Sequence, residues 1–136
     1  MRTPLALLHA ATTGAIIESF YEVHRELGFG FRELIYSLAL ERVLIAKGHK
    51  VDREVAVMVY FRGEPVTRQT IDMIVDDKVL VENKARKHLP DDATEQPFSY
   101  LCATDLEVGL LLHFGRKPRF YRLFFENRFK QRDRGK

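Results

Sequence analysis

Two hydrophobic periodicities divide the chain, a helical one before residue 48 and a two-residue alternation after it. Over residues 13–27, apolar positions recur every three or four residues, which predicts an amphipathic helix. Glycines interrupt this pattern at 28 and 30, and a second helix is expected from about residue 31 to residue 47, before Gly48. Apolar positions cover most of the circumference of the second helix, so we expect it to be buried on more than one side.

The alternating region predicts three consecutive strands that form an antiparallel meander. Their expected ranges are 51–61, 66–75 and 79–85, with turns at 62–65 and 76–78. A polar stretch then leads into a third helix, with Thr94 as its expected N-cap and Pro97 in its first turn, where a missing N–H costs little.

Two further strands are expected after this third helix, at 107–115 and 119–127. A helix between the third and fourth strands is the usual crossover that makes two strands parallel. The nearly continuous apolar run of the fourth strand favours burial on both faces of the sheet. The predicted fold class is therefore α/β, with a mixed β-sheet made of an antiparallel meander and a parallel strand added after the helical crossover.

Length and composition support a single folded unit. The 136 residues fit one domain, and a hydrophobic content of 46% argues against extensive disorder. Apolar runs fall short of the roughly 20 residues that a membrane span needs, so we expect a soluble, cytoplasmic protein with no membrane partner. The single cysteine, Cys102, has no cysteine partner for a disulfide or a zinc site, and we expect it to be a small buried hydrophobe.

Basic residues are concentrated at the C-terminal end. The net charge is +3, but the segment from Arg116 onward holds nine basic and two acidic residues, so residues 1–115 carry a net charge of −4. We therefore divide the chain into a domain, 1–127, and a basic tail, 128–136. The tail either follows a phosphate backbone, as basic arms do, or is a solvated segment that keeps the protein soluble.

Within residues 72–85, three charged residues interrupt the apolar pattern of the expected strands. Glu82 and Lys84 share one face of their strand, and a three-residue turn before that strand would place Asp72 directly opposite Glu82. Like charges placed opposite each other are destabilising, so two adjacent carboxylates require a reason. One is a divalent metal, because Mg²⁺ favours one or two carboxylates together with waters and phosphate oxygens. The alternative is a salt bridge of Lys84 with Glu82 or Asp72 on a solvated sheet face.

Asp72, nine intervening residues and then Glu82-Asn83-Lys84 resemble the signature of the PD-(D/E)XK nuclease superfamily. The heptapeptide "GFRELIY", residues 30–36, resembles the motif that names its GxxExxY family. This resemblance implies a restriction-endonuclease-like core and a nuclease, dependent on Mg²⁺ (or Mn²⁺), that hydrolyses phosphodiester bonds. It also implies that Asp72 and Glu82 bind the metal and that Lys84 acts on the attacking water or the phosphate.

The same resemblance assigns roles to residues outside the strands. Glu33 would supply a further acidic group from the second helix, although a carboxylate there is also favourable against the helix dipole without any function. Gln96 and Tyr100, spaced i to i+4, match a QxxxY pattern and would orient Lys84 or contact nucleic acid. Asn83 departs from the apolar residue usual at its position, and its amide needs a hydrogen-bonding partner there.

His24 and Tyr36 each have two interpretations. They are either core residues or members of the site. Arg128, Lys130 and Arg132 are the tail residues expected to contact nucleic acid. DNA is favoured over RNA as the substrate, and a domain this small could form a homodimer to cut two strands. The alternative function is a catalytically inert nucleic-acid-binding or protein-interaction module that retains the nuclease fold.

Overall fold

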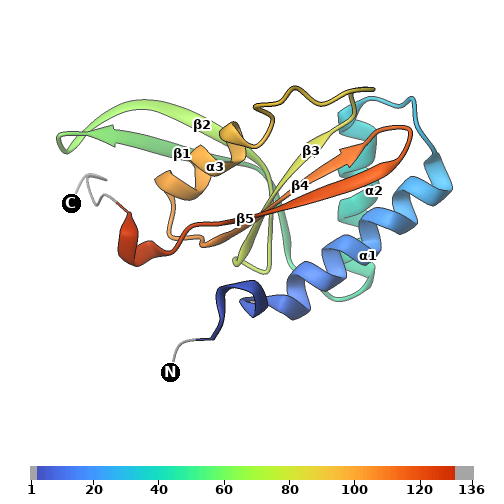
Figure 1. Ribbon diagram of the computed structural model, residues 1–136, viewed down its shortest axis with the longest axis horizontal. Helices are drawn as coiled ribbons and strands as arrows, with labels where there is room; N and C mark the ends of the chain where they lie inside the picture. The colour runs from blue at the N-terminus through green and yellow to red at the C-terminus, as the bar shows by residue number, and fades with distance from the viewer. Residues whose placement is uncertain (1–2, 131–136) are drawn as a thin grey trace.

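Helices cover both faces of a five-stranded mixed sheet in the computed structural model, which describes residues 3–130 (Figure 1). The strands lie side by side in sequence order. They are β1 (Val51–Phe61), β2 (Glu64–Val75), β3 (Val79–Lys84), β4 (Val108–Phe114) and β5 (Pro118–Phe124). The helices are α1 (Ala10–Leu27), α2 (Glu33–Ala46) and α3 (Glu95–Ala103), with short 3₁₀ turns η1 (Leu5–Leu7) and η2 (Asn127–Phe129). This order and the mixed sheet confirm the predicted α/β class.

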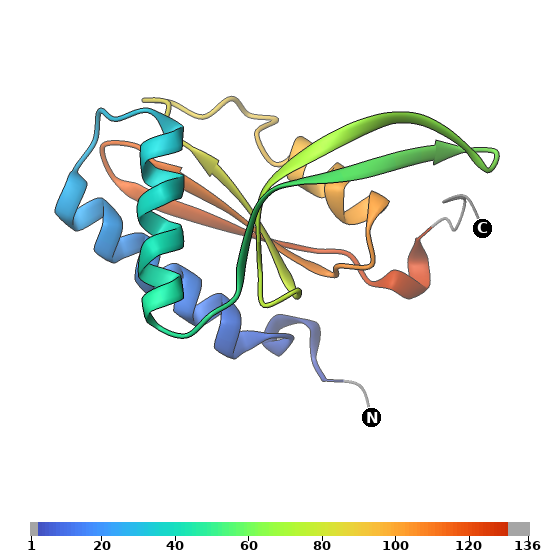
Figure 2. The same cartoon turned by 180° about the vertical axis from the view of Figure 1, so that it is seen from behind.

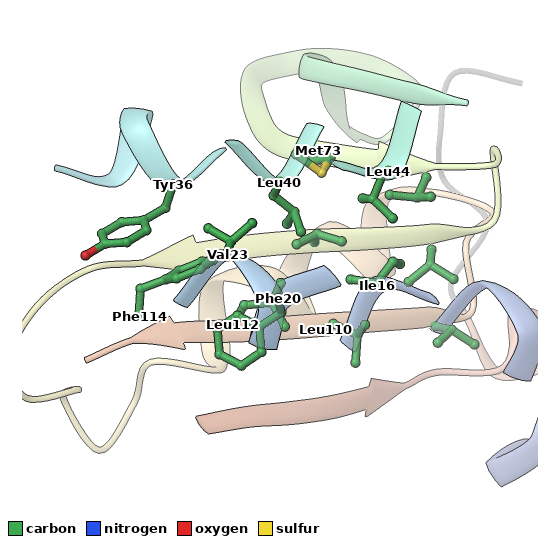
Figure 3. Packing of buried hydrophobic residues seen from close by; sticks show 14 residues of the cluster. Ile16, Phe20, Val23, Tyr36, Leu40, Leu44, Met73, Leu110, Leu112 and Phe114 are labelled. Atoms are coloured by element: carbon green, nitrogen blue, oxygen red, sulfur yellow. The ribbon is translucent and has the colours of Figure 1, made fainter. Parts of the chain in front are cut away.

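Two hydrophobic clusters hold the layers together. The larger one joins α1 and α2 to one face of the sheet (Figure 3). Its members include Ile16, Phe20, Val23, Tyr36, Leu40, Leu44, Met73, Leu110, Leu112 and Phe114. A smaller cluster joins α3 to the opposite face through Ile71, Leu80, Tyr100 and Leu101. Every residue of β4 is buried, since helices lie on both faces of the sheet at this interior strand.

Strand pairing agrees with the expected topology. Val75 pairs with Val79 across the turn 76–78, so β2 and β3 are antiparallel in the predicted register. β3 and β4 are parallel, and α3 is the crossover between them. Thr94 is the N-cap residue of α3, as predicted, but its side chain makes no capping hydrogen bond.

Tyr36 fixes the connection between α1 and α2. Its hydroxyl donates a hydrogen bond to the Gly28 carbonyl at 2.5 Å and accepts one from the Phe31 N–H at 3.2 Å. Its ring stacks on Phe114 with 4.4 Å between the ring centroids (Figure 3). Gly28 and Gly30 both have positive φ angles, 70° and 124°, which non-glycine residues adopt only with strain. Tyr36 is therefore a core residue that shapes the glycine-containing loop.

Three expectations about burial and the tail are corrected. α2 packs through one stripe against α1 and the sheet, so Leu34 and Ile45 are each 54% exposed, and the prediction of burial on more than one side is wrong. Cys102 is exposed on α3 and not buried. Lys130, predicted to contact nucleic acid, is 7% exposed, and its ammonium donates hydrogen bonds to the carbonyls of Thr104 and Leu106.

Arg128 and Arg132 are the other two tail residues that were predicted to contact nucleic acid. Arg128 is exposed and forms an ion pair with Glu126. Arg132 lies outside the described residues. No helix within residues 3–130 is long and apolar enough to cross a bilayer.

Replacing Tyr36 with phenylalanine tests the loop contact. Tyr36→Phe keeps the ring but removes both hydrogen bonds, so we expect the free energy of unfolding to fall by about 1–3 kcal/mol. Tyr21→Phe is the matched control, because Tyr21 is a partly exposed tyrosine of α1, and it should change stability by less than about 0.5 kcal/mol. Urea unfolding followed by circular dichroism measures both. Equal stabilities of the two variants would contradict the role of the Tyr36 hydroxyl.

Candidate functional site

The candidate site lies where the β1–β2 ribbon leaves the sheet (Figure 2). Pairing of β2 with β3 ends at Met73↔Val81, and the same register would place Asp72 opposite Glu82 one residue further on. Instead of a backbone bond, the Asp72 carboxylate accepts a hydrogen bond from the Asn83 N–H at 2.9 Å. The Asp72 side chain thus replaces the missing ladder partner of β3 at the point where the strands separate.

A backbone irregularity in β1 accompanies this separation. Glu54, which the register places opposite Asp72, has a φ of 55°, a conformation that is strained for a glutamate. Before it, Arg53 faces α2 and forms an ion pair with Glu41 at 3.3 Å. After it, Val55 packs in the cluster beneath α3. The positive φ therefore switches which face alternate residues of β1 occupy and turns the ribbon away from the sheet.

Glu82 is the most constrained side chain of the site. It is 4% exposed, and its Oε2 lies 3.5 Å from the Lys84 ammonium nitrogen. Its other oxygen, Oε1, is buried and has no hydrogen-bond partner within the described part of the chain. Lys84 is 26% exposed, so its charged end reaches the surface from the same strand face. The two side chains share a face as strand alternation predicts.

When no cation is bound, the electrostatic environment of the site favours the protonated form of Glu82. Burial, and then the neighbouring Asp72 charge, raise the pKa of Glu82 to about 8, against a smaller opposing effect of Lys84. Burial together with the charges of Glu82 and Asp72 raises the pKa of Tyr100 to about 12. The phenol of Tyr100 thus stays neutral and forms part of the wall around the two carboxylates.

The opposite face of β3 anchors the site to α2. Asn83 points to the helix-covered side, as expected, and its Nδ2 donates a hydrogen bond to the Ser37 Oγ at 3.0 Å. Ser37 therefore satisfies the Asn83 amide nitrogen, whereas the buried Oδ1 of Asn83 has no hydrogen-bond partner within the described part of the chain. Ser37 follows Glu33 by one helical turn, so the spacing was visible in the sequence, but nothing in the sequence alone indicated which residue would meet Asn83.

Glu33 borders the site without joining a cluster of ligands. A hollow of about 170 Å³ is lined by Glu33, Leu34, Ser37, Arg53, Glu54 and Asp72. Glu33 is exposed in the first turn of α2. Among residues 3–130, no three His, Cys, Asp or Glu side chains gather closely enough to hold a metal ion together. Glu33 thus faces the same opening as Asp72 from the helical side.

Gln96 and Tyr100 differ in their placement. Gln96 is exposed and lines a hollow of about 330 Å³ together with Lys84 and Arg86. Tyr100 is 3% exposed and packs against Ile71 and Leu101, so its ring is not free to stack on a base. We therefore assign Tyr100 to the wall of the site and no longer to a nucleic-acid contact.

His24 lies away from these residues. Its Nε2 is 2.7 Å from the carbonyl oxygen of Gly115, and because a carbonyl can only accept, the Nε2–H donates this hydrogen bond. α1 covers the sheet face opposite to Glu82 and Lys84. The geometry favours the core interpretation of His24, as it does for Tyr36.

Comparison with known proteins supports the α/β fold and identifies the superfamily of the chain. Residues 10–123 match the sequence profile of the PD-(D/E)XK nuclease superfamily. The chain belongs to this superfamily. The solved crystal structure of SSO0001 is similar in fold, with a TM-score of 0.54 and 24% identity over 68% of this chain and 49% of that chain. This chain thus spans about half the length of SSO0001, and no curated protein matches it.

The superfamily typically uses divalent metals, and the residues of this site suit one. A buried carboxylate oxygen without a partner costs about 1–3 kcal/mol or more, and a cation beside it would remove that cost. Asp72 and Glu82 supply the one or two carboxylates that Mg²⁺ takes alongside waters. The donor set of Asp72 and Glu82 therefore fits a hard divalent ion.

The raised pKa of Glu82 predicts a pH-dependent stability of the metal-free protein. Between the usual value of 4.5 and about 8, the unfolded chain releases the Glu82 proton while the folded chain keeps it, so stability falls as pH rises through this window. Glu82→Gln removes this loss. In EDTA, we expect the variant to gain about 1–3 kcal/mol relative to wild type at pH 8.5 and little at pH 4.5.

Urea unfolding at the two pH values measures this difference. Glu95→Gln is the control, because Glu95 is an exposed carboxylate of α3, and its effect should be small at both. The interpretation fails if Glu82→Gln changes stability equally at pH 4.5 and pH 8.5.

Proposed function

We propose that the protein is a divalent-metal-dependent nuclease that hydrolyses phosphodiester bonds in nucleic acid, with Asp72, Glu82 and Lys84 as its catalytic group. The observation that carries this proposal is the buried Glu82, which has one unbonded oxygen and lies beside Asp72 and Lys84. A buried carboxylate next to another acid destabilises a fold unless its charge is compensated, which favours a cation site at this position. Membership of the nuclease superfamily supports the same conclusion.

Within the superfamily, the GxxExxY family is the subgroup that we assign. Gly30, Glu33 and Tyr36 occupy the three motif positions. Gly30 and Tyr36 shape the loop between α1 and α2, and Glu33 opens α2 at the mouth of the site. The motif thus combines two structural residues with one acidic residue directed to the site.

Each catalytic residue has a distinct role in the proposed reaction. Asp72 and Glu82 would hold Mg²⁺ or Mn²⁺, which when bound supplies positive charge that stabilises the reacting phosphate. Lys84 carries an ammonium that reaches the surface beside them, where it orients the attacking water or neutralises charge on the phosphate. Gln96 lines the hollow that contains Lys84 and would help to position the substrate there.

Substitutions at Lys84 and Asp72 separate catalysis from metal binding. Lys84→Ala should leave metal binding largely intact, because an ammonium is not a ligand, and should lower the cleavage rate by about 10²- to 10⁴-fold. Asp72→Asn should weaken metal binding as well as abolish cleavage. Calorimetric titration with Mn²⁺ measures binding, and labelled single- and double-stranded DNA and RNA with Mg²⁺, Mn²⁺ or EDTA measure cleavage.

DNA is the substrate that we expect to be cleaved in preference to RNA, and a homodimer is the assembly that would cut both strands of a duplex. Lys78→Ala is the matched control for Lys84→Ala, since Lys78 is an exposed lysine in the turn before β3. If wild type cuts none of the four substrates with either metal while Lys84→Ala binds nucleic acid as tightly as wild type, the protein is an inert binding module.

The tail contributes to nucleic-acid binding in this proposal through Arg128 and Arg132. Lys130 is left out, because its ammonium is bound to backbone carbonyls. Truncation after Lys130 removes three basic residues and one acidic residue and keeps the Lys130 contacts. We expect weaker binding and a shallower dependence of affinity on salt, because fewer counterions are released from phosphates. Anisotropy titrations at several salt concentrations measure this, and an unchanged slope would identify the segment as a solvated tail.

A further inference from the structure

A basic hollow of about 380 Å³ opens on the described surface of the protein. Its lining residues come from the loop after β3 and from the β4–β5 hairpin. They are Lys87, His88, Leu89, His113, Arg116, Lys117, Arg119 and Tyr121. Four of these eight residues are Lys or Arg, two are His and none is acidic. We refer to this feature as the basic hollow.

Strand register places the basic hollow on the same sheet face as the catalytic residues. Lys84 in β3 pairs with His113 in β4, and His113 pairs with Arg119 in β5. Paired residues of neighbouring strands share a face, and Lys84 alternates with Asn83, which faces α2. Lys84, His113 and Arg119 therefore form a row across the face that carries Glu82. Two strand spacings separate Lys84 from Arg119, about 10 Å.

The cations of the basic hollow lack acidic partners. Lys87, Arg116, Lys117 and Arg119 form no ion pair with any acid among residues 3–130, and Arg116 lies over the Phe29 ring at 5.8 Å. Elsewhere in the protein, Lys47, Lys50 and Arg53 each pair with carboxylates. Uncompensated cations gathered in one concavity produce a positive potential that attracts an anion.

One contact holds the loop side of the hollow in position. His113 is 7% exposed, and its Nε2 is 2.5 Å from the carbonyl oxygen of Arg86. This bond ties the segment that carries Lys87 and His88 to the end of β4. The two sides of the basic hollow are therefore fixed to the same strand, so the cations are held near one another before any ligand binds.

We propose that the basic hollow is a phosphate-binding subsite for nucleic acid, which holds backbone phosphates two or three nucleotides from the bond that is cleaved beside Lys84. Successive phosphates of one strand advance about 3.4 Å along the axis of a duplex and are farther apart in a straight line, so a separation of about 10 Å corresponds to two or three nucleotides. Four cations exceed the charge of one phosphate group, about −1.5 to −2, which favours a chain of phosphates over a single free ion. Only the distance to the cleaved bond depends on the proposed nuclease function; the binding does not.

A matched pair of double variants tests the proposal in the full-length chain. Lys117→Gln/Arg119→Gln removes two cations from the basic hollow. Arg42→Gln/Lys78→Gln removes the same charge from exposed positions on α2 and the β2–β3 turn, outside the hollow. Fluorescence anisotropy with a labelled oligonucleotide in EDTA measures binding without cleavage, over a range of salt concentrations and with inorganic phosphate as a second probe.

We expect the hollow variant to bind the oligonucleotide about 10- to 30-fold more weakly near 0.1 M salt and its salt slope to fall by about 1.4 for a single strand, while the control variant stays close to wild type. If wild type cleaves, the hollow variant should raise KM and leave kcat nearly unchanged. Equal losses in both variants would reduce the effect to net charge and overturn the proposal.

Three other outcomes are decisive as well. If inorganic phosphate binds and the hollow variant loses that binding while its oligonucleotide affinity is unchanged, the site is for a small anion and the proposal is wrong. If wild type cleaves nothing but the hollow variant alone loses oligonucleotide affinity, the subsite stands and the nuclease function fails. Cleavage with equal KM in all three proteins would instead retain the nuclease and remove the subsite.

Discussion

The hydrogen bond from the Asn83 N–H to the Asp72 carboxylate is the contact on which the site depends. Backbone pairing between β2 and β3 has already ended at Met73↔Val81, and without a substitute the next N–H of β3 would lose its partner. An aspartate side chain takes the place of a backbone carbonyl. The same bond fixes the carboxylate beside Glu82, so the end of the ladder and the position of the acid are one structural feature.

The two faces of β3 differ in role: one anchors the strand to α2, and the other carries the candidate site residues. Asn83 is fully buried and bonded to Ser37, which holds the strand against α2. Glu82 and Lys84 face the other way, where α3 covers the sheet only in part and Lys84 reaches the surface. Burial of Glu82 beside Asp72 destabilises the ionised metal-free protein. Burial of the two hydrophobic clusters, one on each face of the sheet, stabilises the fold and offsets this destabilisation.

Much of the fold could be predicted from the sequence because the helices and strands have clear hydrophobic periodicities or are bounded by glycine, proline or polar turn residues. The three-residue turn 76–78 set the register that places Asp72 near Glu82, and strand alternation placed Glu82 and Lys84 together. Burial was harder to predict, because it depends on which partners the topology supplies. α2 is apolar around most of its circumference, yet it meets neighbours on one stripe only, and Leu34 stays exposed.

The surroundings of the basic C-terminal residues were equally hard to predict from the sequence. Residues after Arg116 share a basic composition, but the structure gives them different surroundings. Lys130 turns back to bind the carbonyls of Thr104 and Leu106, whereas Arg119 joins the basic hollow. The sum of charges along the sequence could not separate these cases, since the hollow also needs Lys87 from a loop about 30 residues earlier.

Charge on the α3 face of the sheet changes sign over a short distance. Asp72 and Glu82 lie near the β2–β3 edge, Lys84 borders them, and the cations of the basic hollow follow across β4 and β5. An anionic strand laid across this face would meet repulsion from Asp72, and also from Glu82 above its raised pKa of about 8, unless a cation were bound there. At the hollow it would meet attraction in any case. In the proposed function two requirements are therefore separate: the hollow would hold nucleic acid without metal, whereas a phosphate would approach the two acids only where protonation of Glu82 or a bound cation lowers their negative charge.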